Sequence, residues 1–515
     1  MEFLSLPDDY DKESTSRGLA SLNCLPQAQK QEAVAIDLSK DGNILLYGSP
    51  GTGKTTFLQT AAMDLARKQS PENLTMYLLD FGTNGLAPLT QLPHVADSLL
   101  LDQTEKIQKF IRIINRELDR RKKLLSEHGV GTIALYREVT GKQEPTMVIL
   151  MDSYESMKDE PYETDLFKLF MRISREGLSI GVHLIITASR QNNLRAQLYS
   201  NFKHQLTLPQ NDISEVRGIV GATPLAATME DIKGRALMKR DEVDVVQFAL
   251  PVAGDNDIQI INNLRDQVQS LKEMWTGQTP AGIPMVPDEL TIQNFMSMPT
   301  TRKVIEDHQL PVGLELEEVE TIGLPMKKLK HLMLLSDKDS SLSLVTKHMI
   351  RTVVETVSGH KVTILDPTDE YKTFVASVNN YVPSTSDFKS VIEQLKEQVH
   401  YARQNGGDFE HYIFITDMGQ FVSESGVETN DIGLLMEEGL KVGLHFVFSM
   451  HKNFISAYND TAKYLKSQLD TALIAMKMSD QTIFTRTSIG REEALPEDQV
   501  YLHYQASQTK LKITK

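Results

Sequence analysis

The feature that most constrains this chain is an eight-residue stretch rich in glycine. Residues 48–55 read Gly-Ser-Pro-Gly-Thr-Gly-Lys-Thr, which matches the pattern G-x-x-x-x-G-K-[ST]. The apolar run Ile44–Tyr47 comes directly before it, and the helical pattern Thr55–Lys68 follows. Glycines let the backbone curl so that its N–H groups face an anion, and a helix N-terminus adds favourable partial charge. The stretch therefore predicts a phosphate-binding loop between a buried strand and a helix.

Each position of this loop has an expected part in holding ATP with Mg²⁺. Lys54 should reach the β- and γ-phosphates, and Thr55 should place its hydroxyl on the metal ion. The backbone N–H groups of the loop should surround the phosphates. The expected nucleotide-binding set is Gly48, Ser49, Pro50, Gly51, Thr52, Gly53, Lys54, Thr55 and Thr56.

Such a site also needs an acidic group on a neighbouring strand. Asp152 ends the apolar run Met147–Met151 and is predicted to organise Mg²⁺ together with Thr55. Many ATPases of this class carry a glutamate directly after that aspartate to orient the attacking water, but this chain has Ser153. Glu155 could take that part, or it could be a solvated loop residue, and the sequence does not separate the two.

Thr187 completes the candidate catalytic set of Asp152, Glu155 and Thr187. It ends another apolar run, where its hydroxyl could contact the γ-phosphate or the water, or could only satisfy its own backbone. Because Ser153 replaces the usual glutamate, slow hydrolysis is expected.

Apolar runs bounded by turn residues alternate with helical patterns through the first half of the chain. Such runs are typical of buried parallel strands, and they occur at 44–47, 75–79, 146–151 and 183–187. Residues 105–125 form a helical pattern whose apolar face carries Ile107, Phe110, Ile111, Ile114 and Leu118. The alternation predicts an α/β fold in which helices flank a parallel sheet.

The second half of the chain repeats the first in a diverged form. Three segments return in the same order: residues 77–80 as 363–366, residues 148–152 as 413–417, and residues 175–187 as 437–449. A repeat of this length predicts two copies of one domain. A chain of 515 residues is also too long for one ordinary core. We expect a domain at 1–276, a connection at 277–310 and a degenerate second domain at 311–515.

The second copy lacks the phosphate-binding loop. Aligned on the preceding strand, residues 336–343 take the place of 48–55, and Leu342 stands where the lysine should be. Asp337 and Asp339 would repel phosphate. Ordinary P-loop catalysis is not expected there, although weak nucleotide binding through backbone groups and Ser343 stays open.

Charge and hydropathy limit the other functions. The formal net charge of −15 opposes non-specific binding of nucleic acid. The basic stretch at 112–123 is interleaved with acidic residues, which favours a solvated helix face. No apolar run reaches the ~18 residues of a membrane span, and the N-terminus lacks the features of a secretory signal peptide. A cytoplasmic setting is expected, with membrane attachment supplied from elsewhere.

These motifs make the chain resemble the FtsK/SpoIIIE ATPases. The resemblance rests on residues 39–55, on Asp80-Phe-Gly, on residues 175–187 and on Gly234-Arg235. A tandem pair with a degraded last copy further resembles the membrane-bound coupling ATPases of type VIIb secretion systems. The resemblance implies two tandem RecA-like P-loop NTPase domains, the second of them degenerate. It also implies a hexameric full-length protein at the cytoplasmic side of the cell membrane.

The resemblance implies a function in protein secretion. The expected partners are small secreted helical-hairpin proteins and other components of the secretion system, whereas nucleic acid is not expected as a partner. Two alternatives are a DNA translocase of the same fold and a scaffold that binds nucleotide without hydrolysing it. The isolated chain is expected to be monomeric.

Overall fold

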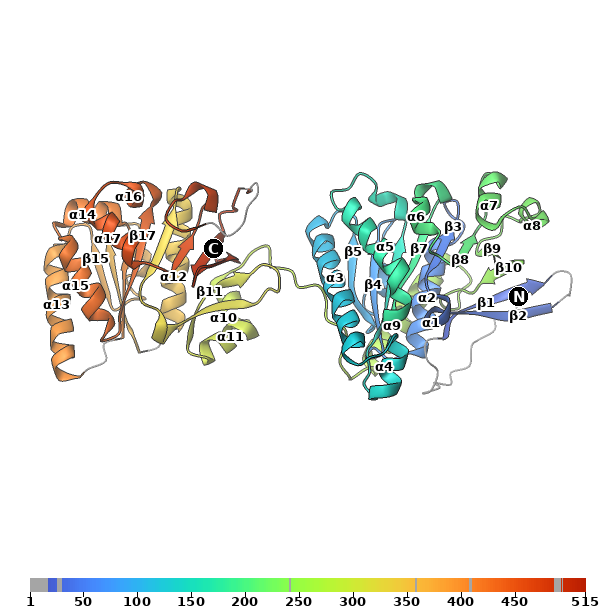
Figure 1. Ribbon diagram of the computed structural model, residues 1–515, viewed down its shortest axis with the longest axis horizontal. Coiled ribbons are helices and arrows are strands. Elements are labelled where there is room, and N and C mark those ends of the chain that lie inside the picture. The colour runs from blue at the N-terminus through green and yellow to red at the C-terminus, as the bar shows by residue number, and fades with distance from the viewer. Residues whose placement is uncertain are drawn as a thin grey trace. The chain divides into compact units, whose positions relative to one another are not determined.

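The protein forms two compact units, Met1–Ile283 and Pro284–Lys515 (Figure 1). The computed structural model describes residues 17–25, 30–239, 242–356, 359–406, 410–485, 492 and 494–515. Residues 1–16, which bear on the argument against a signal peptide, lie outside this description. Among the described residues, no helix combines the length and the apolar character that a membrane span requires.

The first unit is built around a ten-stranded sheet. Its outer part is antiparallel, and its strands β8, β3, β7, β6, β4 and β5 run parallel to one another. In sheet order the strands are β2 (Lys30–Asp37), β1 (Arg17–Leu25), β10 (Val243–Phe248), β9 (Arg235–Lys239), β8 (His204–Thr207), β3 (Ile44–Tyr47), β7 (Val182–Ala188), β6 (Thr146–Asp152), β4 (Leu74–Asp80) and β5 (Val95–Leu100).

The second unit repeats this sheet strand for strand. Its ten strands follow the same pattern of antiparallel and parallel neighbours, which confirms the predicted α/β fold in two tandem copies. In sheet order they are β12 (Thr321–Pro325), β11 (Gln309–Glu315), β20 (Ser507–Lys512), β19 (Gln499–Tyr504), β18 (Ala472–Ile474), β13 (Leu332–Ser336), β17 (Leu444–His451), β16 (His411–Ile415), β14 (Lys361–Asp366) and β15 (Asn380–Pro383).

Helices cover both faces of each sheet. In the first unit they are α1 (Leu38–Asp41), α2 (Lys54–Lys68), α3 (Thr104–Glu127), α4 (Ile133–Thr140), α5 (Glu163–Ile180), α6 (Ala196–Tyr199), α7 (Ile213–Val220), α8 (Pro224–Ala227) and α9 (Asp257–Met274). In the second they are α10 (Ile292–Ser297), α11 (Pro299–Glu306), α12 (Asp339–Thr356), α13 (Phe388–Asn405), α14 (Met418–Ser425), α15 (Thr429–Leu440), α16 (Lys452–Ser456) and α17 (Asp460–Gln468).

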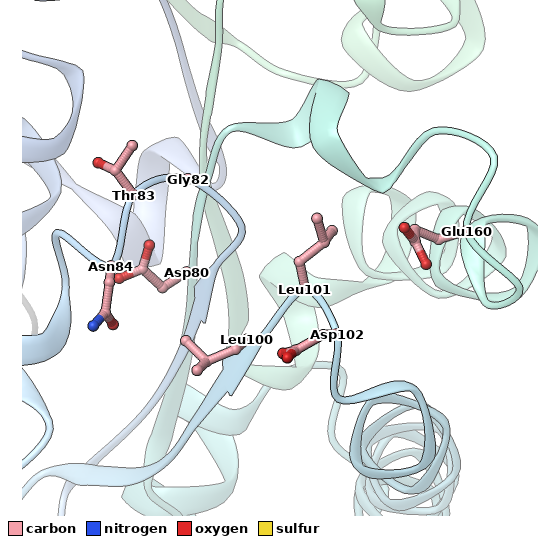
Figure 2. A pocket seen from close by; sticks show the side chains of 8 residues that line it. All are labelled: Asp80, Gly82, Thr83, Asn84, Leu100, Leu101, Asp102 and Glu160. Carbon is pink, nitrogen blue, oxygen red and sulfur yellow. The ribbon is translucent and has the colours of Figure 1, made fainter.

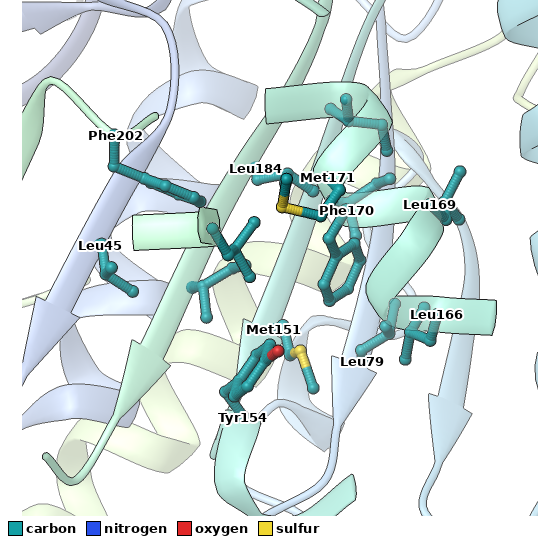
Figure 3. Close-up of a cluster of buried hydrophobic side chains, with 14 of the residues drawn as sticks. Leu45, Leu79, Met151, Tyr154, Leu166, Leu169, Phe170, Met171, Leu184 and Phe202 are labelled. Atoms are coloured by element: carbon teal, nitrogen blue, oxygen red, sulfur yellow. The ribbon is translucent and has the colours of Figure 1, made fainter. Parts of the chain in front are cut away.

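The apolar core of the first unit lies in two layers. In β3, Leu45 and Tyr47 join the layer under α3 and α5, while Ile44 and Leu46 join the layer under α2 and α9. Figure 3 shows part of the first layer, where side chains of α5 pack on the parallel strands. Burial on both faces explains why these strands read as continuous apolar runs.

The segment 277–310 contains the division between the units. Ile283 is buried in the core of the first unit, whereas Leu290 and Phe295 pack with Leu314 in the second. Most of this segment is therefore a structured part of the second unit.

The strand register corrects one detail of the sequence repeat. In the first unit Leu79 pairs with Met151, and in the second Leu365 pairs with Ile415. The position of Asp152 therefore falls to Thr416, not to Asp417 as the sequence alignment of 148–152 with 413–417 predicted. The sequence alignment was wrong by one residue because both segments are almost entirely apolar. A run without alternating polar and apolar residues does not determine which positions correspond.

The basic stretch at 112–123 is occupied by interactions within the unit. The Arg121 guanidinium, whose side chain is 1% exposed, donates hydrogen bonds to Glu117 (2.7 Å) and to the carbonyls of Ile180 and Pro145 (both 2.9 Å). It thus satisfies a carbonyl at the C-terminus of α5, where a cation is also favoured by the helix dipole. The expectation of a solvated helix face is wrong at this residue.

Two histidines of the second unit are buried in the neutral state. His348 accepts a hydrogen bond at Nδ1 from the backbone N–H of Thr514 (3.2 Å), so its Nε2–H donates to the carbonyl of Val312 (3.1 Å). His331 accepts in the same way from the N–H of Phe446 (3.1 Å). Burial lowers the pKa of each imidazole to about 4.

Replacing Arg121 by methionine should lower the free energy of unfolding of the first unit by about 2–4 kcal/mol. The substitution removes the donor of the buried carbonyl of Ile180 and of the partly buried carbonyl of Pro145. Urea unfolding followed by circular dichroism measures the change. Lys123→Met is the control, because the Lys123 side chain is 78% exposed and its loss should cost less than about 0.5 kcal/mol. An Arg121→Met protein as stable as the control would contradict the structural role of the guanidinium.

The second unit should lose stability as the pH falls from about 6.5 to 4. In this range an unfolded histidine is protonated while buried His331 and His348 stay neutral, so the unfolded chain binds more protons. At pH 5 each should cost about 1–2 kcal/mol relative to pH 7. Urea midpoints at the two pH values test this, and His348→Gln should show a smaller loss than the parent. An equal loss in both proteins would exclude His348 as a contributor.

Candidate functional site

The residues of the glycine-rich loop connect β3 to α2 at the carboxyl end of the parallel strands. Gly51 and Gly53 adopt φ angles of 81° and 110°, which side chains other than hydrogen strongly disfavour. The N–H of Gly48 bonds to the carbonyl of Ala188 (3.1 Å), and the N–H of Ser49 bonds to that of Pro209 (3.1 Å). Neighbouring segments therefore fix the start of the loop.

A second contact holds the end of the loop. The N–H of Gly234 donates to the carbonyl of Thr52 (2.9 Å), directly before β9. A Cβ on Gly53 would lie 3.3 Å from the Gly234 nitrogen, so both positions favour glycine. The Thr52 hydroxyl donates to the Ser49 carbonyl (2.8 Å), which closes the turn from within. The curled backbone is thus preorganised as an anion cradle.

Lys54 lies folded over this loop. Its ammonium donates to the carbonyls of Gly48 (2.7 Å) and Ser49 (3.1 Å). Burial lowers the pKa of Lys54, whereas the charges of Glu155 and Asp152 act in the opposite direction. Pro50 and Gly51 are exposed, whereas Lys54 is partly buried. Thr56 is the third residue of α2, and its carbonyl accepts from the Thr60 hydroxyl (3.0 Å).

The structure brings Thr55, Asp152 and Thr187 together. Asp152 is 2% exposed, and its two oxygens accept hydrogen bonds from the hydroxyls of Thr55 (2.7 Å) and Thr187 (2.6 Å). The Thr187 hydroxyl in turn accepts from the N–H of Ser153 (3.1 Å). A carboxylate and a hydroxyl side by side at the start of a P-loop helix provide oxygen ligands of the kind that Mg²⁺ prefers.

Glu155 is held at the same edge of the sheet. Ser153, just before it, has a φ of 62°, a left-handed conformation that is uncommon for serine. The chain then turns so that both oxygens of Glu155 accept from the N–H of Ser189 (3.2 Å each). Glu155 is half-buried, and its charge acts on Lys54. The carboxylate is therefore anchored beside the cradle.

The sequence reasoning did not single out the loop 81–85, which also borders the site. The carbonyl of Gly85 accepts from the side chain of Gln59 (2.7 Å), and a Cβ on Gly85 would lie 2.4 Å from the Thr55 methyl group. A Cβ on Gly82 would lie 3.1 Å from Asp152. The sequence signal was present in Asp80-Phe-Gly, which carried the family resemblance but no assigned role.

The corresponding place in the second unit has no comparable cradle. The strand β13 ends at Ser336 and α12 begins at Asp339, so the helix starts where the loop would curl around phosphate. Leu342, at the lysine position, is 6% exposed. Asp366 is saturated by donors: Thr368 and Thr416 at one oxygen, and Tyr371 and Tyr381 at the other.

A family model matches part of the first unit, and relatives match almost the whole chain. Residues 6–235 match the model of the FtsK/SpoIIIE family. The type VII secretion system protein EssC of Staphylococcus aureus is 32% identical over 506 residues, which are 96% of this chain and 33% of EssC. This chain thus spans about a third of the length of that relative.

Solved structures agree with the fold. The second and third ATPases of EssC from Geobacillus thermodenitrificans match with a TM-score of 0.87 and 25% identity, over 100% of both chains. The second and third ATPases of Thermomonospora curvata EccC, solved with a signal sequence peptide, match with a TM-score of 0.56 and 19% identity, over 98% of this chain and 94% of that one. The chain belongs to the FtsK/SpoIIIE family, and its two units are similar to the second and third ATPases of EssC.

Proposed function

We propose that this chain is the nucleotide-dependent motor part of a type VII protein secretion system and that its first unit binds ATP with Mg²⁺. The nucleotide part of the proposal rests on the contact of Asp152 with the hydroxyls of Thr55 and Thr187 beside the glycine-rich cradle. The secretion part is supported by the likeness to EssC. The fit to a nucleotide is supported by the positive φ angles of Gly51 and Gly53, which shape that cradle.

Each residue of the first unit has a definite part in this proposal. The N–H groups of Gly51 and of residues 53–56 would face the phosphates, whereas those of Gly48 and Ser49 hold the loop to its neighbours. Lys54 would exchange its bonds to the loop carbonyls for phosphate oxygens. Thr55 and Asp152 hold Mg²⁺, which neutralises phosphate charge. Thr187 fixes the orientation of Asp152, and Glu155 accepts a proton or hydrogen bond from water. The displacement of Glu155 by two residues from the usual glutamate position makes turnover slow.

The proposed partners follow from the secretion proteins that resemble this chain. They are small secreted helical-hairpin proteins and other components of the secretion system, met at the cytoplasmic side of the membrane. The full-length protein would be hexameric, and the isolated chain monomeric. Nucleic acid is not favoured as a partner, because basic residues of the 112–123 stretch pair with acidic neighbours within the unit.

The second unit serves as a binding platform in this proposal. Its sheet is intact, but α12 already begins at Asp339, Leu342 stands at the lysine position, and Thr416 stands at the position of Asp152, so the groups of a phosphate site are missing. A conserved architecture without that chemistry is suited to present a surface. We propose 1–276 and 311–515 as the limits of the two ATPase modules, with 277–310 as the connection, whose residues from Pro284 onward belong to the second compact unit.

Lys54→Ala should abolish ATP binding to the whole chain. The substitution removes the one ammonium of the cradle, and we expect affinity for Mg²⁺-ATP to fall at least ~100-fold. Calorimetry on the parent should give one site per chain. Lys338→Ala is the matched control, because that lysine lies in the corresponding region of the second unit and should leave binding unchanged. Retention of one equivalent of ATP in Lys54→Ala would place nucleotide in the second unit and defeat the proposal.

Glu155→Gln should lower ATP hydrolysis by roughly 10²-fold while changing the affinity for ATP by less than about threefold. The amide keeps one acceptor for the N–H of Ser189 but cannot take a proton. Phosphate release under single-turnover conditions separates this effect from binding. Glu215→Gln, which removes the partner of Arg190 instead, is the control. If Glu155→Gln hydrolyses ATP at the rate of the parent, Glu155 has no part in hydrolysis and serves only to bind the N–H of Ser189 after β7.

A further inference from the structure

The Glu155 carboxylate is anchored on the main chain at Ser189. Both of its oxygens accept from the N–H of Ser189 (3.2 Å each), the residue that directly follows β7. Because β7 ends at Ala188, the strand ladder no longer holds Ser189, and its main-chain groups need other partners. What fixes Ser189 therefore also fixes the position of the carboxylate.

The side chain of Gln210 supplies such a partner. Its Nε2 donates to the carbonyl of Ser189 (3.1 Å), so the two main-chain groups of Ser189 bind Glu155 and Gln210 respectively. Gln210 lies three residues after the end of β8, and β8 and β7 flank β3 on its two sides. The amide thus spans the carboxyl end of the strand that carries the glycine-rich loop.

Gln210 and its neighbours in the chain also hold the cradle. The Ser49 hydroxyl donates to Oε1 of Gln210 (3.4 Å) and accepts from the N–H of Asn211 (3.2 Å). The N–H of Ser49 binds the carbonyl of Pro209 (3.1 Å). A glutamine amide can make both of its contacts at once because it carries a donor and an acceptor. Gln210 therefore lies between the phosphate cradle and the residue that anchors Glu155.

The second unit has neither end of this connection. Counted from the ends of β8 and β18, which pair with corresponding residues of β3 and β13, Lys477 takes the position of Gln210. A lysine has donors but no acceptor, so it cannot make both contacts of the amide. Gly419 takes the position of Glu155, as the register of β14 with β16 shows. The amide and the carboxylate are present together in one copy and absent together in the other.

We propose that Gln210 is a positioning residue for ATP hydrolysis, and this inference rests on the proposed function of the first unit. By holding the carbonyl of Ser189 beside the cradle, Gln210 keeps the N–H of Ser189, and with it Glu155, in place. It acts through Ser189 and does not bind phosphate. A displacement of about 1 Å at a reacting group can cost up to ~100-fold in rate, so a loose anchor is enough to slow hydrolysis.

The effect of Gln210 is separate from the pocket that opens at the same sheet edge. This pocket, of about 380 Å³, lies at the carboxyl ends of β4 and β5 (Figure 2). Asp80 lies in its wall and ends β4, as Asp366 ends β14 in the second unit. Within the described residues, Oδ1 of Asp80 has no hydrogen-bond partner, and it is closed off from solvent. Since β4 and β5 lie on the far side of β6 from β8, a change at Gln210 should leave this pocket as it is.

Gln210→Leu removes both hydrogen-bonding groups at nearly the same side-chain size. It should lower single-turnover hydrolysis about tenfold while changing the affinity for Mg²⁺-ATP less than about threefold. Added to Glu155→Gln, it should cost less than about twofold more, because both changes act through one carboxylate. Gln205→Leu is the matched control and should keep the rate of the parent. The Gln205 amide also donates to main-chain carbonyls, those of Tyr199 (2.9 Å) and Phe202 (3.3 Å), but near the start of β8.

A second measurement uses the whole chain without nucleotide. In protein labelled with ¹⁵N at serine, the exchange rate of the Ser189 amide hydrogen reports whether this N–H is bonded. The signal is assigned by its loss in Ser189→Ala. Exchange should be at least about fivefold faster than in the parent in both Gln210→Leu and Glu155→Ala, and unchanged in Gln205→Leu. Gln210→Ala, which adds no bulk to the turn, should behave as Gln210→Leu does.

Three results would overturn the proposal. The first is unchanged exchange at Ser189 in both Gln210 variants, provided that thermal unfolding shows them to be folded. The second is a full tenfold loss of hydrolysis when Gln210→Leu is added to Glu155→Gln. The third is a loss of ATP affinity in Gln210→Leu as large as its loss of rate, which would make Gln210 a nucleotide ligand. A parent that does not hydrolyse ATP, together with fast exchange in Gln210→Leu, would instead contradict the proposed function and keep Gln210 as the support of the Glu155 anchor.

Discussion

The site of the first unit depends on one carboxylate, that of Asp152, which connects β6 to α2 and β7. Asp152 ends β6, Thr55 is the second residue of α2, and Thr187 lies near the end of β7. Both hydroxyls bond to the same carboxylate. Parallel strands bring these chain segments to one edge, although they are far apart in the sequence. Because Asp152 is buried, each hydroxyl that satisfies it also fixes the helix or strand that carries it. The glycine-rich loop can hold its curled shape only while α2 and β7 stay in this register, since its first N–H bonds to the end of β7.

The second unit shows what the same sheet becomes when that carboxylate is absent. Thr416 takes the position of Asp152, and Ser449 takes that of Thr187, as the pairing of Leu334 with Ser449 and of Leu46 with Thr187 shows. The Ser449 hydroxyl bonds to Thr346 on α12 (2.8 Å), so hydroxyl pairs replace the carboxylate at the junction of helix and strand. The contact between α12 and β17 thereby contains no carboxylate, although Asp366, whose carboxylate accepts from Thr416, stays buried beside it. Neutral hydrogen-bonded groups avoid the desolvation cost of an ionised carboxylate, which explains how the fold persists after the phosphate chemistry is lost.

The sequence predicted those features that depend on residues close together along the chain. The glycine-rich motif located the strand, loop and helix around Lys54 because glycine, lysine and an apolar run at fixed spacing have few other uses. The α/β fold followed from apolar runs such as 146–151, which burial on both faces requires. The predicted alignment of the second copy with the first was wrong by one residue, because a continuous apolar run matches almost equally well after a shift of one position. Buried Arg121 was missed because a basic residue on a helix is usually solvated, and its carbonyl partners on α5 come close only in the fold. The sequence also could not show that Asp80 Oδ1 has no hydrogen-bond partner among the described residues, because this depends on which donors surround it in the fold.

The contrast between Asp80 and Asp366 gives a physical reason for asymmetry between the copies. Leaving a buried acceptor without a donor costs about 1–3 kcal/mol, which selection for stability alone would remove. The second unit has removed it, since Tyr381 and Thr416 satisfy Asp366. The first unit keeps the cost at Asp80, and it also keeps Ser153 in a left-handed conformation nearby. Two unfavourable features at one sheet edge are expected where a site must change its contacts when a ligand arrives. At this sheet edge, therefore, the copy with the glycine-rich loop keeps an unpaired acceptor at Asp80, whereas the second copy satisfies the corresponding carboxylate of Asp366.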